Sequence, residues 1–471
     1  MLLLPPLAAP SITEETKKLR LLGVEMAAEP SSESVSANTT FPLQWWISRR
    51  LVSLISFAVY FLKSPISMHL CSFLTCPWKT TKLFPSAVFS FLRDAGKGSL
   101  REVPLPASRP PLPWTTRLFV SLVALLTDVV RRPDGTVRRS LSRLDVMVGP
   151  DANSTRGVRT ADIAVDPSRN LWFRLFLPDL LGGSGKKLPV IVFFHGGGFA
   201  FLSPATMAYD AVCRRICREI GALVVSVNYR LSPEHRCPAP YDDGVDVLRF
   251  FDSSNLPAST GDVDSGGNLF DLFLENADLS NCFVAGDSAG ANIAHHVTRL
   301  WTAEDQKLLP LHGRVRLAGV IVIQPFFGGN GRVESEVRLA GAPLVNTERT
   351  DWLWRAFLPD GASRDHEAAS PVASVVELGK GFPPAMVVVG GFDPLQDWQR
   401  RYAESLKQRG KDARLVEYPT AIHGFYMLPG LAASATPLME EIRSFVLKHS
   451  DSAAVKEDVG AEKRLHCKDQ R

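Results

Sequence analysis

From about residue 160 onward, short apolar runs alternate with stretches of helical periodicity. The runs predict strands at 188–194, 223–229, 282–287, 317–323 and 385–391. The stretches between and after them predict helices at 206–219, 241–252, 289–301, 350–358 and 396–409. Continuous, β-branched apolar runs are typical of strands that are buried on both faces of a parallel sheet. Repeated strand–helix units in this order predict an α/β fold with a mostly parallel, doubly wound sheet and helices on both faces.

The first 112 residues show no sustained helical or strand periodicity. They contain clusters such as EPSSES and PLPASRPPLP, and they hold 12 Lys and Arg against 7 Asp and Glu. The apolar run at 51–62 is 12 residues long, whereas a helix needs about 20 to span a bilayer. We therefore expect residues 1–112 to be disordered or a non-native extension. A signal peptide is disfavoured, and so is membrane contact through residues 41–78.

An α/β domain is expected over residues 113–449, followed by a disordered polar tail at 450–471. The domain begins with a predicted helix at 114–130, which has a broad apolar face and carries Arg117 and Asp128 on its narrow polar side. A helix with so wide an apolar face must cover another surface.

Two positions for this helix remain open. It can pack on the back of the sheet, or it can form a lid above the carboxyl ends of the strands, where ligands bind in folds of this type. We expect the lid, with Leu122 and Leu125 lining the pocket beneath it.

The charge balance and the cysteines limit the function classes. The net charge is only +4, and residues beyond 112 hold 41 Lys and Arg against 42 Asp and Glu, so we expect no nucleic-acid partner. The odd number of scattered cysteines disfavours a disulfide framework and favours a reducing, cytoplasmic location. Cys213 and Cys217 have no histidine close in sequence, so a zinc site is disfavoured and no metal or cofactor is expected. The cysteines are Cys71, Cys76, Cys213, Cys217, Cys237, Cys282 and Cys467.

A serine lies between small residues where a predicted strand meets a predicted helix. Residues 286–290 are GDSAG, so Gly286 and Gly290 flank Ser288 at two residues on each side. A sharp strand-to-helix turn exposes a nucleophilic hydroxyl, and only small neighbours fit around it. The N–H groups at the start of the helix also favour negative charge nearby. On this fragment alone, an ordinary serine helix cap explains the motif equally well.

Two polar residues that follow later strands can complete a catalytic set. A nucleophilic serine needs a base, and the base needs an acid that orients it. Asp393 follows a buried strand in VVVGGFDPLQD, with Asp397 four residues on, and His423 follows the last strand in ARLVEYPTAIHGFY. An Asp-Pro turn or a lone loop histidine is a weak signal by itself. The order along the chain, each residue at the carboxyl end of a strand, predicts a triad of Ser288, Asp393 and His423.

The motif HGGGF at 195–199 directly follows the predicted strand that begins at residue 188. Acyl transfer develops a negative oxygen, and backbone N–H groups must point at it. Glycines allow bare backbone to approach a substrate closely. We expect the N–H groups of Gly197, Gly198 and Ala289 to form an oxyanion hole, with Gly196 as the alternative donor. A merely flexible glycine turn is the competing interpretation.

Taken together, these motifs resemble those of the hormone-sensitive-lipase-like group of α/β-hydrolases, and among them the plant carboxylesterases. The resemblance covers about residues 112–449. It rests on the segments RRPDGTVRR, FFHGGGFAFLSP, VNYRLSPEHRCPAPYDDG, GDSAG, IQPFFGG, GFDPLQDWQR and HGFY. It implies an α/β-hydrolase fold and a serine carboxylesterase that acts on small or short-chain esters. Ala291 departs from the pattern, because the family more often has glycine there.

The resemblance extends to plant gibberellin receptors, which share the fold and keep the serine. It implies that these receptors hold an aliphatic residue in place of the base and a tyrosine at the position of Leu353. This chain has His423 and Leu353, so we expect an enzyme. A non-catalytic, hormone-like receptor for a small molecule is the alternative.

Other polar residues near the motifs are expected to support the site. His195 should fix the oxyanion loop by hydrogen bonding, and Asp287 cannot be the triad acid if Asp393 is. His295 and His296 lie one to two helical turns beyond the serine and should point away from the substrate. The residues expected to support the site are His195, Gly286, Asp287 and Gly290. Asp242 and Asp243, at the start of a predicted helix, are expected to anchor a loop.

Overall fold

The computed structural model describes most of the chain from residue 110 to residue 450. The described ranges are 110–142, 146–179, 187–253, 266–303, 312–428, 430–431 and 434–450. All of them belong to one compact unit, Val88–Arg471. Within them, no helix is long and apolar enough to cross a bilayer. The expectations for residues 1–109, for membrane contact at 41–78 and for the tail beyond residue 450 lie outside these residues.

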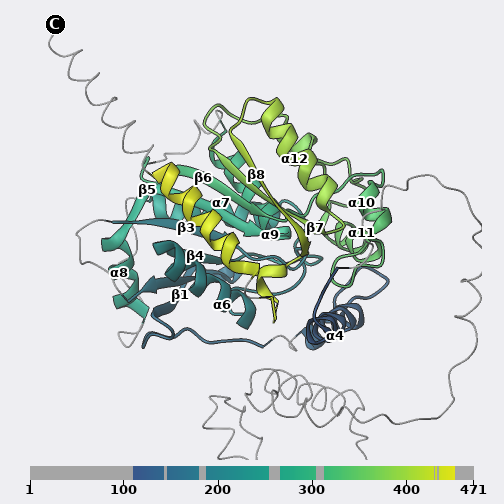
Figure 1. Ribbon diagram of the computed structural model, residues 1–471. Coiled ribbons are helices and arrows are strands. Elements are labelled where there is room, and N and C mark those ends of the chain that lie inside the picture. The colour runs from purple at the N-terminus through teal and green to yellow at the C-terminus, as the bar shows by residue number, and fades with distance from the viewer. Residues whose placement is uncertain are drawn as a thin grey trace, which may run out of the picture. The chain divides into compact units, whose positions relative to one another are not determined.

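The described part of the chain contains an eight-stranded sheet with helices on both faces (Figure 1). Its strand order is β1–β2–β4–β3–β5–β6–β7–β8. β2 is antiparallel to both β1 and β4, whereas the remaining neighbours pair in parallel. The strands are β1 (Val158–Asp166), β2 (Leu171–Pro178), β3 (Leu188–Phe194), β4 (Leu223–Asn228), β5 (Ala277–Asp287), β6 (Leu317–Ile323), β7 (Ala385–Phe392) and β8 (Ala413–Ile422). The predicted α/β fold with a mostly parallel sheet is confirmed.

The helices divide between the two faces of the sheet. Buried side chains of α7, α8, α9 and α12 share one apolar core with the sheet, and those of α6 and the helix at 434–450 share the other. The longer helices are α4 (Trp114–Val130), α6 (Met207–Ile216), α7 (Ala239–Asp252), α8 (Gly266–Asn276), α9 (Ala289–Trp301), α11 (Thr347–Phe357) and α12 (Gln396–Gln408). The shorter ones are α5 (Arg139–Ser142) and α10 (Glu334–Arg338), with a π-helical turn at Cys217–Gly221 and a 3₁₀ turn, η5, at Phe425–Met427.

Strand β3 is apolar throughout because both of its faces are buried. Successive side chains of a strand point to opposite faces. Val190, Val192 and Phe194 enter the core beside α7 and α9, whereas Ile191 and Phe193 enter the core beside α6. Both faces of the strand are therefore buried, and no position is free to be polar.

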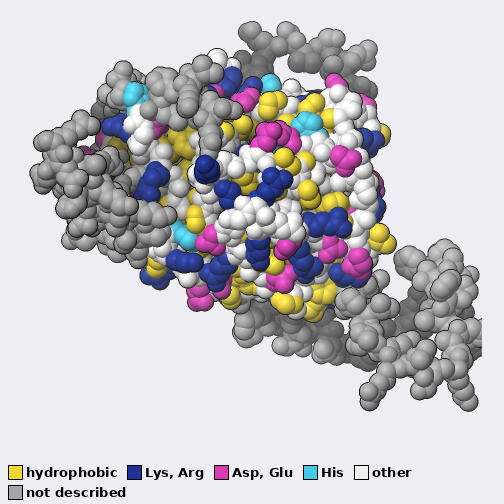
Figure 2. Space-filling view, turned by 90° about the horizontal axis from the view of Figure 1, so that it is seen from above, with side chains coloured by type: hydrophobic (Ala, Val, Ile, Leu, Met, Phe, Trp, Pro, Cys, Tyr) yellow, Lys and Arg dark blue, Asp and Glu magenta, His cyan; other side chains and the backbone are white. Residues whose placement is uncertain are grey.

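The outer surface is polar and mixed in charge on the face drawn in Figure 2. Lys and Arg side chains alternate there with Asp and Glu, and neither sign gathers into one continuous area. This pattern agrees with the near balance of charges in the sequence after residue 112.

Candidate active site

Ser288 occupies a sharp turn between β5 and α9. Its backbone has φ 51° and ψ −119°, in the left-handed region that non-glycine residues rarely adopt. Hydrogen bonds tie the turn to the neighbouring strand: the Ser288 N–H donates to Ile323 O at 2.9 Å, and the Phe326 N–H donates to Ser288 O at 2.9 Å. A strained residue that its surroundings fix in this way is typical of a functional position.

The two glycines of GDSAG allow the helix to start against the sheet. A Cβ atom on Gly290 would lie 2.0 Å from Phe194 O, and one on Gly286 would lie 2.3 Å from Gly290 O. Both contacts are with backbone, which cannot move aside. The sequence therefore needs glycine at both positions for α9 to begin at Ala289.

Asp393 and His423 meet at the carboxyl ends of β7 and β8. The His423 Nδ1 and Asp393 Oδ2 atoms are 2.7 Å apart, and the Asp393 carboxylate is fully buried. Within the described residues, no hydrogen bond joins the Ser288 hydroxyl to His423. Such bonds are often long in substrate-free enzymes and tighten only when substrate binds.

The Asp393 carboxylate is held by several further donors. Its Oδ2 accepts from Gln324 Nε2 at 3.1 Å and from Gln399 Nε2 at 2.8 Å, and its Oδ1 accepts from the Leu395 N–H at 2.9 Å. These bonds satisfy a buried charge, which would otherwise be costly. They also fix the carboxylate in the orientation that faces His423.

Gln324 ties the loop that carries His423 to the acid. Besides its bond to Asp393, its amide donates to Ile422 O at 3.2 Å and accepts from the Gly424 N–H at 2.8 Å. The sequence analysis did not identify Gln324, although it lies within the IQPFFGG segment. The only local signal is a polar residue at the end of a strand that is otherwise apolar.

The pKa of His423 is shifted by two opposing causes. Burial lowers it, but the charge of Asp393 and the hydrogen bond to it together raise the pKa above its ordinary value. A carboxylate that faces the imidazole stabilises its protonated form. This is the property that a base needs when it takes a proton from a serine hydroxyl.

The glycine loop after β3 presents free backbone donors. Among the described residues, none accepts a hydrogen bond from the N–H groups of Gly197, Gly198 or Ala289. The Gly196 N–H instead donates to the Tyr209 hydroxyl at 2.7 Å. The expected alternative donor, Gly196, is therefore already engaged. The first three remain the candidates for an oxyanion hole.

Comparison with known proteins decides the family to which this arrangement belongs. Residues 191–427 match a family model described as the alpha/beta hydrolase fold. The chain belongs to this family. Its α/β-hydrolase fold, inferred from the motifs, is thereby confirmed.

The similar relatives of this α/β-hydrolase include both receptors and esterases. A gibberellin receptor of Arabidopsis thaliana is 40% identical over 359 residues, covering 73% of this chain and 97% of its own length. Carboxylesterase 20 of the same plant is 33% identical, covering 63% of this chain and 88% of its own length.

Two solved structures of esterases have the same fold. An ester-hydrolase from the metagenome of Lake Arreo gives a TM-score of 0.54 at 27% identity, covering 71% of this chain and 98% of its own. An esterase of Pyrobaculum calidifontis gives 0.52 at 26% identity, covering 72% and 99%. The chain is thus similar in sequence to plant gibberellin receptors and plant carboxylesterases, and in structure to microbial esterases.

His195 is buried beside the glycine loop that follows β3. Its Nδ1 lies 2.8 Å from Gly196 O, and its ring stacks on Tyr229 with centroids 4.3 Å apart. Burial lowers the pKa of His195 to about 4, so the ring is neutral near pH 7. These contacts agree with a role in holding the loop.

The two histidines of α9 are also fully buried, away from the triad. His295 contacts the Tyr402 hydroxyl through Nδ1 at 2.8 Å and Ser374 O through Nε2 at 3.2 Å. The ring of His296 stacks on Tyr241 with centroids 4.4 Å apart. Both side chains therefore pack in the apolar core rather than facing the serine.

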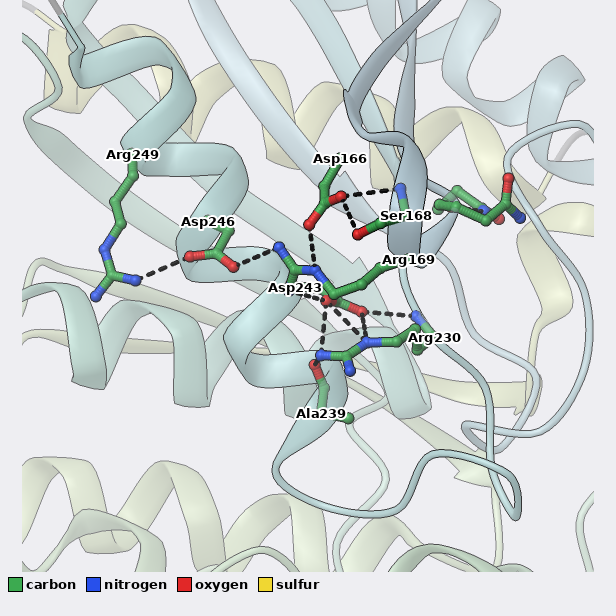
Figure 3. A network of polar contacts seen from close by, with 10 residues as sticks. Asp166, Ser168, Arg169, Arg230, Ala239, Asp243, Asp246 and Arg249 are labelled. Carbon is green, nitrogen blue, oxygen red and sulfur yellow. Dashed lines mark hydrogen bonds and ion pairs between the residues drawn. The ribbon is translucent and has the colours of Figure 1, made fainter.

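Asp243 is the centre of an ion-pair network at the start of α7 (Figure 3). The carboxylate is fully buried and pairs with Arg230 at 2.9 Å and with Arg169 at 3.1 Å. Arg169 also pairs with Asp166 at 2.6 Å, at the turn between β1 and β2. The network joins this turn, the segment after β4 and α7. It accords with the loop-anchoring role expected for Asp243.

Helix α4 packs against segments that carry the site. Its buried Val120 lies in the same core as Phe425 and Leu428, just beyond His423, and its buried Val130 packs with Ala200 of the oxyanion loop. Val130 and Ala200 place the C-terminal end of α4 beside the glycine loop that follows β3. The expectation that Leu125 lines the pocket is wrong, because 59% of its side chain is exposed.

Leu353 of α11 lies against the glycine loop that follows β3. A Cβ atom on Gly198 would lie 2.5 Å from Leu353 Cδ1. Arg349 of the same helix pairs with Asp128 of α4 at 2.6 Å. α4 and α11 together therefore border the loop that carries Gly197 and Gly198.

A surface hollow of about 470 Å³ lies on α11. Trp354, Arg355 and Arg364 are among its lining residues, and none of the triad is. It is therefore separate from the candidate catalytic site.

Proposed function

We propose that this α/β-hydrolase is a serine carboxylesterase that hydrolyses small or short-chain carboxylic esters. The observation that carries the proposal is His423, an imidazole that is hydrogen bonded to a buried carboxylate at the strand ends where Ser288 also lies. A receptor that only binds its ligand has no need of a base held in this way. Among the plant carboxylesterases, the combined motifs resemble the type called carboxylesterase 18. A cytoplasmic location belongs to the same proposal.

The proposed mechanism is acyl transfer in two steps. His423 takes the proton of the Ser288 hydroxyl, and the serine oxygen attacks the ester carbonyl. Asp393 keeps the imidazole in the required tautomer and stabilises its protonated form. His423 then gives the proton to the leaving alcohol. Water, activated by the same histidine, hydrolyses the acyl-enzyme and restores the serine.

The negative oxygen of each tetrahedral intermediate would be bound by backbone donors. The N–H groups of Gly197, Gly198 and Ala289 have no other acceptor among the described residues. Donors that are fixed before the reaction stabilise the developing charge without reorganisation. Removing one such donor from an acyl-transfer enzyme costs about 10²–10³ in kcat.

We propose α4 as a lid that limits the size of the ester. Val120 and Val130 anchor it beside the loops of His423 and the oxyanion hole. Excluding water from the site would strengthen the hydrogen bonds to the oxyanion. Phe119 and Val120 of α4 pack in the core that contains Phe425, whereas Leu125 is exposed.

A non-catalytic receptor is the second candidate. It is favoured by the 40% identity to a protein named a gibberellin receptor. It is disfavoured by His423 and Leu353, because the resemblance seen in the sequence associates receptors with an aliphatic residue and a tyrosine at these positions.

The two candidates separate in one set of assays on the full chain. Hydrolysis of p-nitrophenyl esters of increasing acyl length is measured for the wild type and for Ser288→Ala, and calorimetric titration with a gibberellin is run beside it. Hydrolysis of the short esters by the wild type alone supports the esterase. Saturable gibberellin binding without any hydrolysis would instead establish the receptor.

A further inference from the structure

Two hydrogen bonds in series join the residue before the nucleophile to the oxyanion loop. The Tyr209 hydroxyl donates to Asp287 Oδ2 at 2.9 Å and accepts from the Gly196 N–H at 2.7 Å. Tyr209 comes from α6, Asp287 ends β5, and Gly196 follows β3. All three residues are buried. We call these three groups the Asp287 relay.

The peptide unit between His195 and Gly196 is held at both of its polar atoms. Its N–H donates to Tyr209, and its carbonyl oxygen, His195 O, accepts from the Tyr229 hydroxyl at 2.7 Å. A peptide unit is planar, so fixing both atoms fixes its rotation about the chain. The next two peptide units carry the free N–H groups of Gly197 and Gly198. The relay therefore sets the starting direction of the segment that forms the oxyanion hole.

The loop lies directly on the relay. A Cβ atom on Gly196 would lie 2.7 Å from the Tyr209 hydroxyl oxygen and 2.8 Å from Asp287 Oδ2. Bare backbone at this position lets the amide reach the hydroxyl.

Burial raises the pKa of the Asp287 carboxyl to about 6, and the charge of His423 offsets this only in part. Among the described residues, no Lys, Arg or His forms an ion pair with it, and its Oδ1 is buried without a hydrogen-bond partner. A negative charge next to Ser288 also opposes the oxyanion that forms in the reaction. A carboxylate at this position must therefore have a function that outweighs its burial and its repulsion of the oxyanion. The bond to Tyr209 supplies one, because a charged acceptor strengthens the hydrogen bond and polarises the hydroxyl toward Gly196.

We propose that Asp287 is a positioning residue of the oxyanion hole, acting through the Tyr209 hydroxyl on the peptide unit between His195 and Gly196. This inference rests on the proposed esterase function. Asp287 does not exchange protons with the substrate. It keeps the loop donors aimed at the place where the negative oxygen forms.

The test compares five variants by steady-state kinetics on a short p-nitrophenyl ester and by thermal melting of the full chain. Tyr209→Phe removes the middle of the relay, and Asp287→Ala removes its end. Each is expected to lower kcat about 10- to 100-fold with little change in KM, because oxyanion contacts are stronger in the transition state than with bound substrate. Asp287→Asn keeps a carbonyl acceptor for the hydroxyl but removes its charge, so it should restore only part of the kcat that Asp287→Ala loses.

The combined variant Tyr209→Phe/Asp287→Ala tests whether the two residues act in series. If the two residues act in series, its kcat should match that of the worse single variant. Tyr402→Phe is the matched control. It also removes a buried tyrosine hydroxyl, but this hydroxyl contacts His295, which lies outside the site. It should lower the melting temperature and leave kcat unchanged.

The possible failures can be told apart. A wild-type kcat in Tyr209→Phe and Asp287→Ala, with melting temperatures lowered as in Tyr402→Phe, would overturn the inference alone. Multiplied losses in the combined variant would also overturn it. If Tyr209→Phe does not fold, the comparison of Asp287→Ala with Asp287→Asn decides, and equal kcat values would contradict the proposal. A wild type without hydrolysis overturns the esterase function and this inference with it.

Discussion

The loop after β8 and the middle of α9 each contain buried histidines, yet the pKa values of these histidines are shifted in opposite directions. Burial lowers the pKa of His295 to about 3 and that of His296 well below its ordinary value. The pKa of His423, which is also buried, is raised because Asp393 faces it. Burial alone therefore produces an inert neutral ring, whereas burial with a fixed carboxylate produces a base.

The contacts of the two regions explain the difference. His295 is bound by a neutral hydroxyl and a carbonyl oxygen, and His296 packs face to face on Tyr241. Neither contact offsets the loss of water around a positive ring. His423 instead faces a carboxylate that Gln324 and Gln399 hold in place. Deleting each set of contacts should therefore have different consequences.

The largest expected effect follows the removal of the base. His423→Ala should lower kcat on the order of a million-fold, about as much as Ser288→Ala, because triad members act as a unit. Steady-state ester hydrolysis measures it, and circular dichroism checks that the fold is kept. If a folded His423→Ala protein kept a kcat near that of the wild type, His423 would be no more catalytic than the buried histidines of α9.

Removing only the charge of the acid should cost less. Asp393→Asn keeps the size of the side chain but favours the wrong tautomer of His423. By analogy with other triads, kcat should fall about 10⁴-fold. A fall of less than tenfold would mean that Asp393 does not orient the base.

The pH dependence of ester hydrolysis shows whether the pKa of His423 is raised or lowered. The base must be neutral to take a proton from Ser288, so kcat/KM should fall about tenfold per pH unit once the pH drops below the raised pKa of His423. The midpoint of this limb should lie above 6.5, the ordinary pKa of a histidine side chain. A midpoint below that value would indicate a histidine shifted by burial, as His295 and His296 are.

The smallest effect on catalysis is expected in α9. His295→Phe fills the same space but leaves the Tyr402 hydroxyl and Ser374 O without their partner. Unpaired buried polar groups cost about 1–3 kcal/mol each, so the free energy of unfolding should decrease by a few kcal/mol while kcat stays within about twofold. Urea unfolding and ester hydrolysis measure the two effects. A large loss of kcat in a folded variant would show that α9 contributes to the chemistry.

Much of the fold could be predicted because the parallel strands are buried on both faces. Such strands are apolar throughout, and β3 and β6 were predicted with the bounds that the structure shows. The pair β1 and β2 was not predicted, because polar residues interrupt it. Arg174 of β2, for example, is buried against Asp162 and Asp210. A charge that is paired across the sheet looks in the sequence like an exposed position.

The residues that support the site could not be found in the same way. Gln324 contacts Asp393 and Gly424, which lie 69 and 100 positions further along the chain. Tyr209 is 78 positions from Asp287. Helical periodicity likewise revealed the wide apolar face of α4 but not which edge of it turns inward, and Leu125 was therefore misplaced. Only the folded chain brings these groups together.

Covalent labelling of the nucleophile tests the central claim most directly. The full-length wild type is incubated with a p-nitrophenyl alkylphosphonate, and the adduct is followed by intact mass and located by peptide mapping. We predict that the wild type gains one phosphonyl group per chain, on Ser288. Because His423 activates the serine, His423→Ala should react more slowly by a factor on the order of a thousand or more. Ser288→Ala should gain no phosphonyl group. Ester hydrolysis by a protein whose Ser288 remains unlabelled would contradict the account.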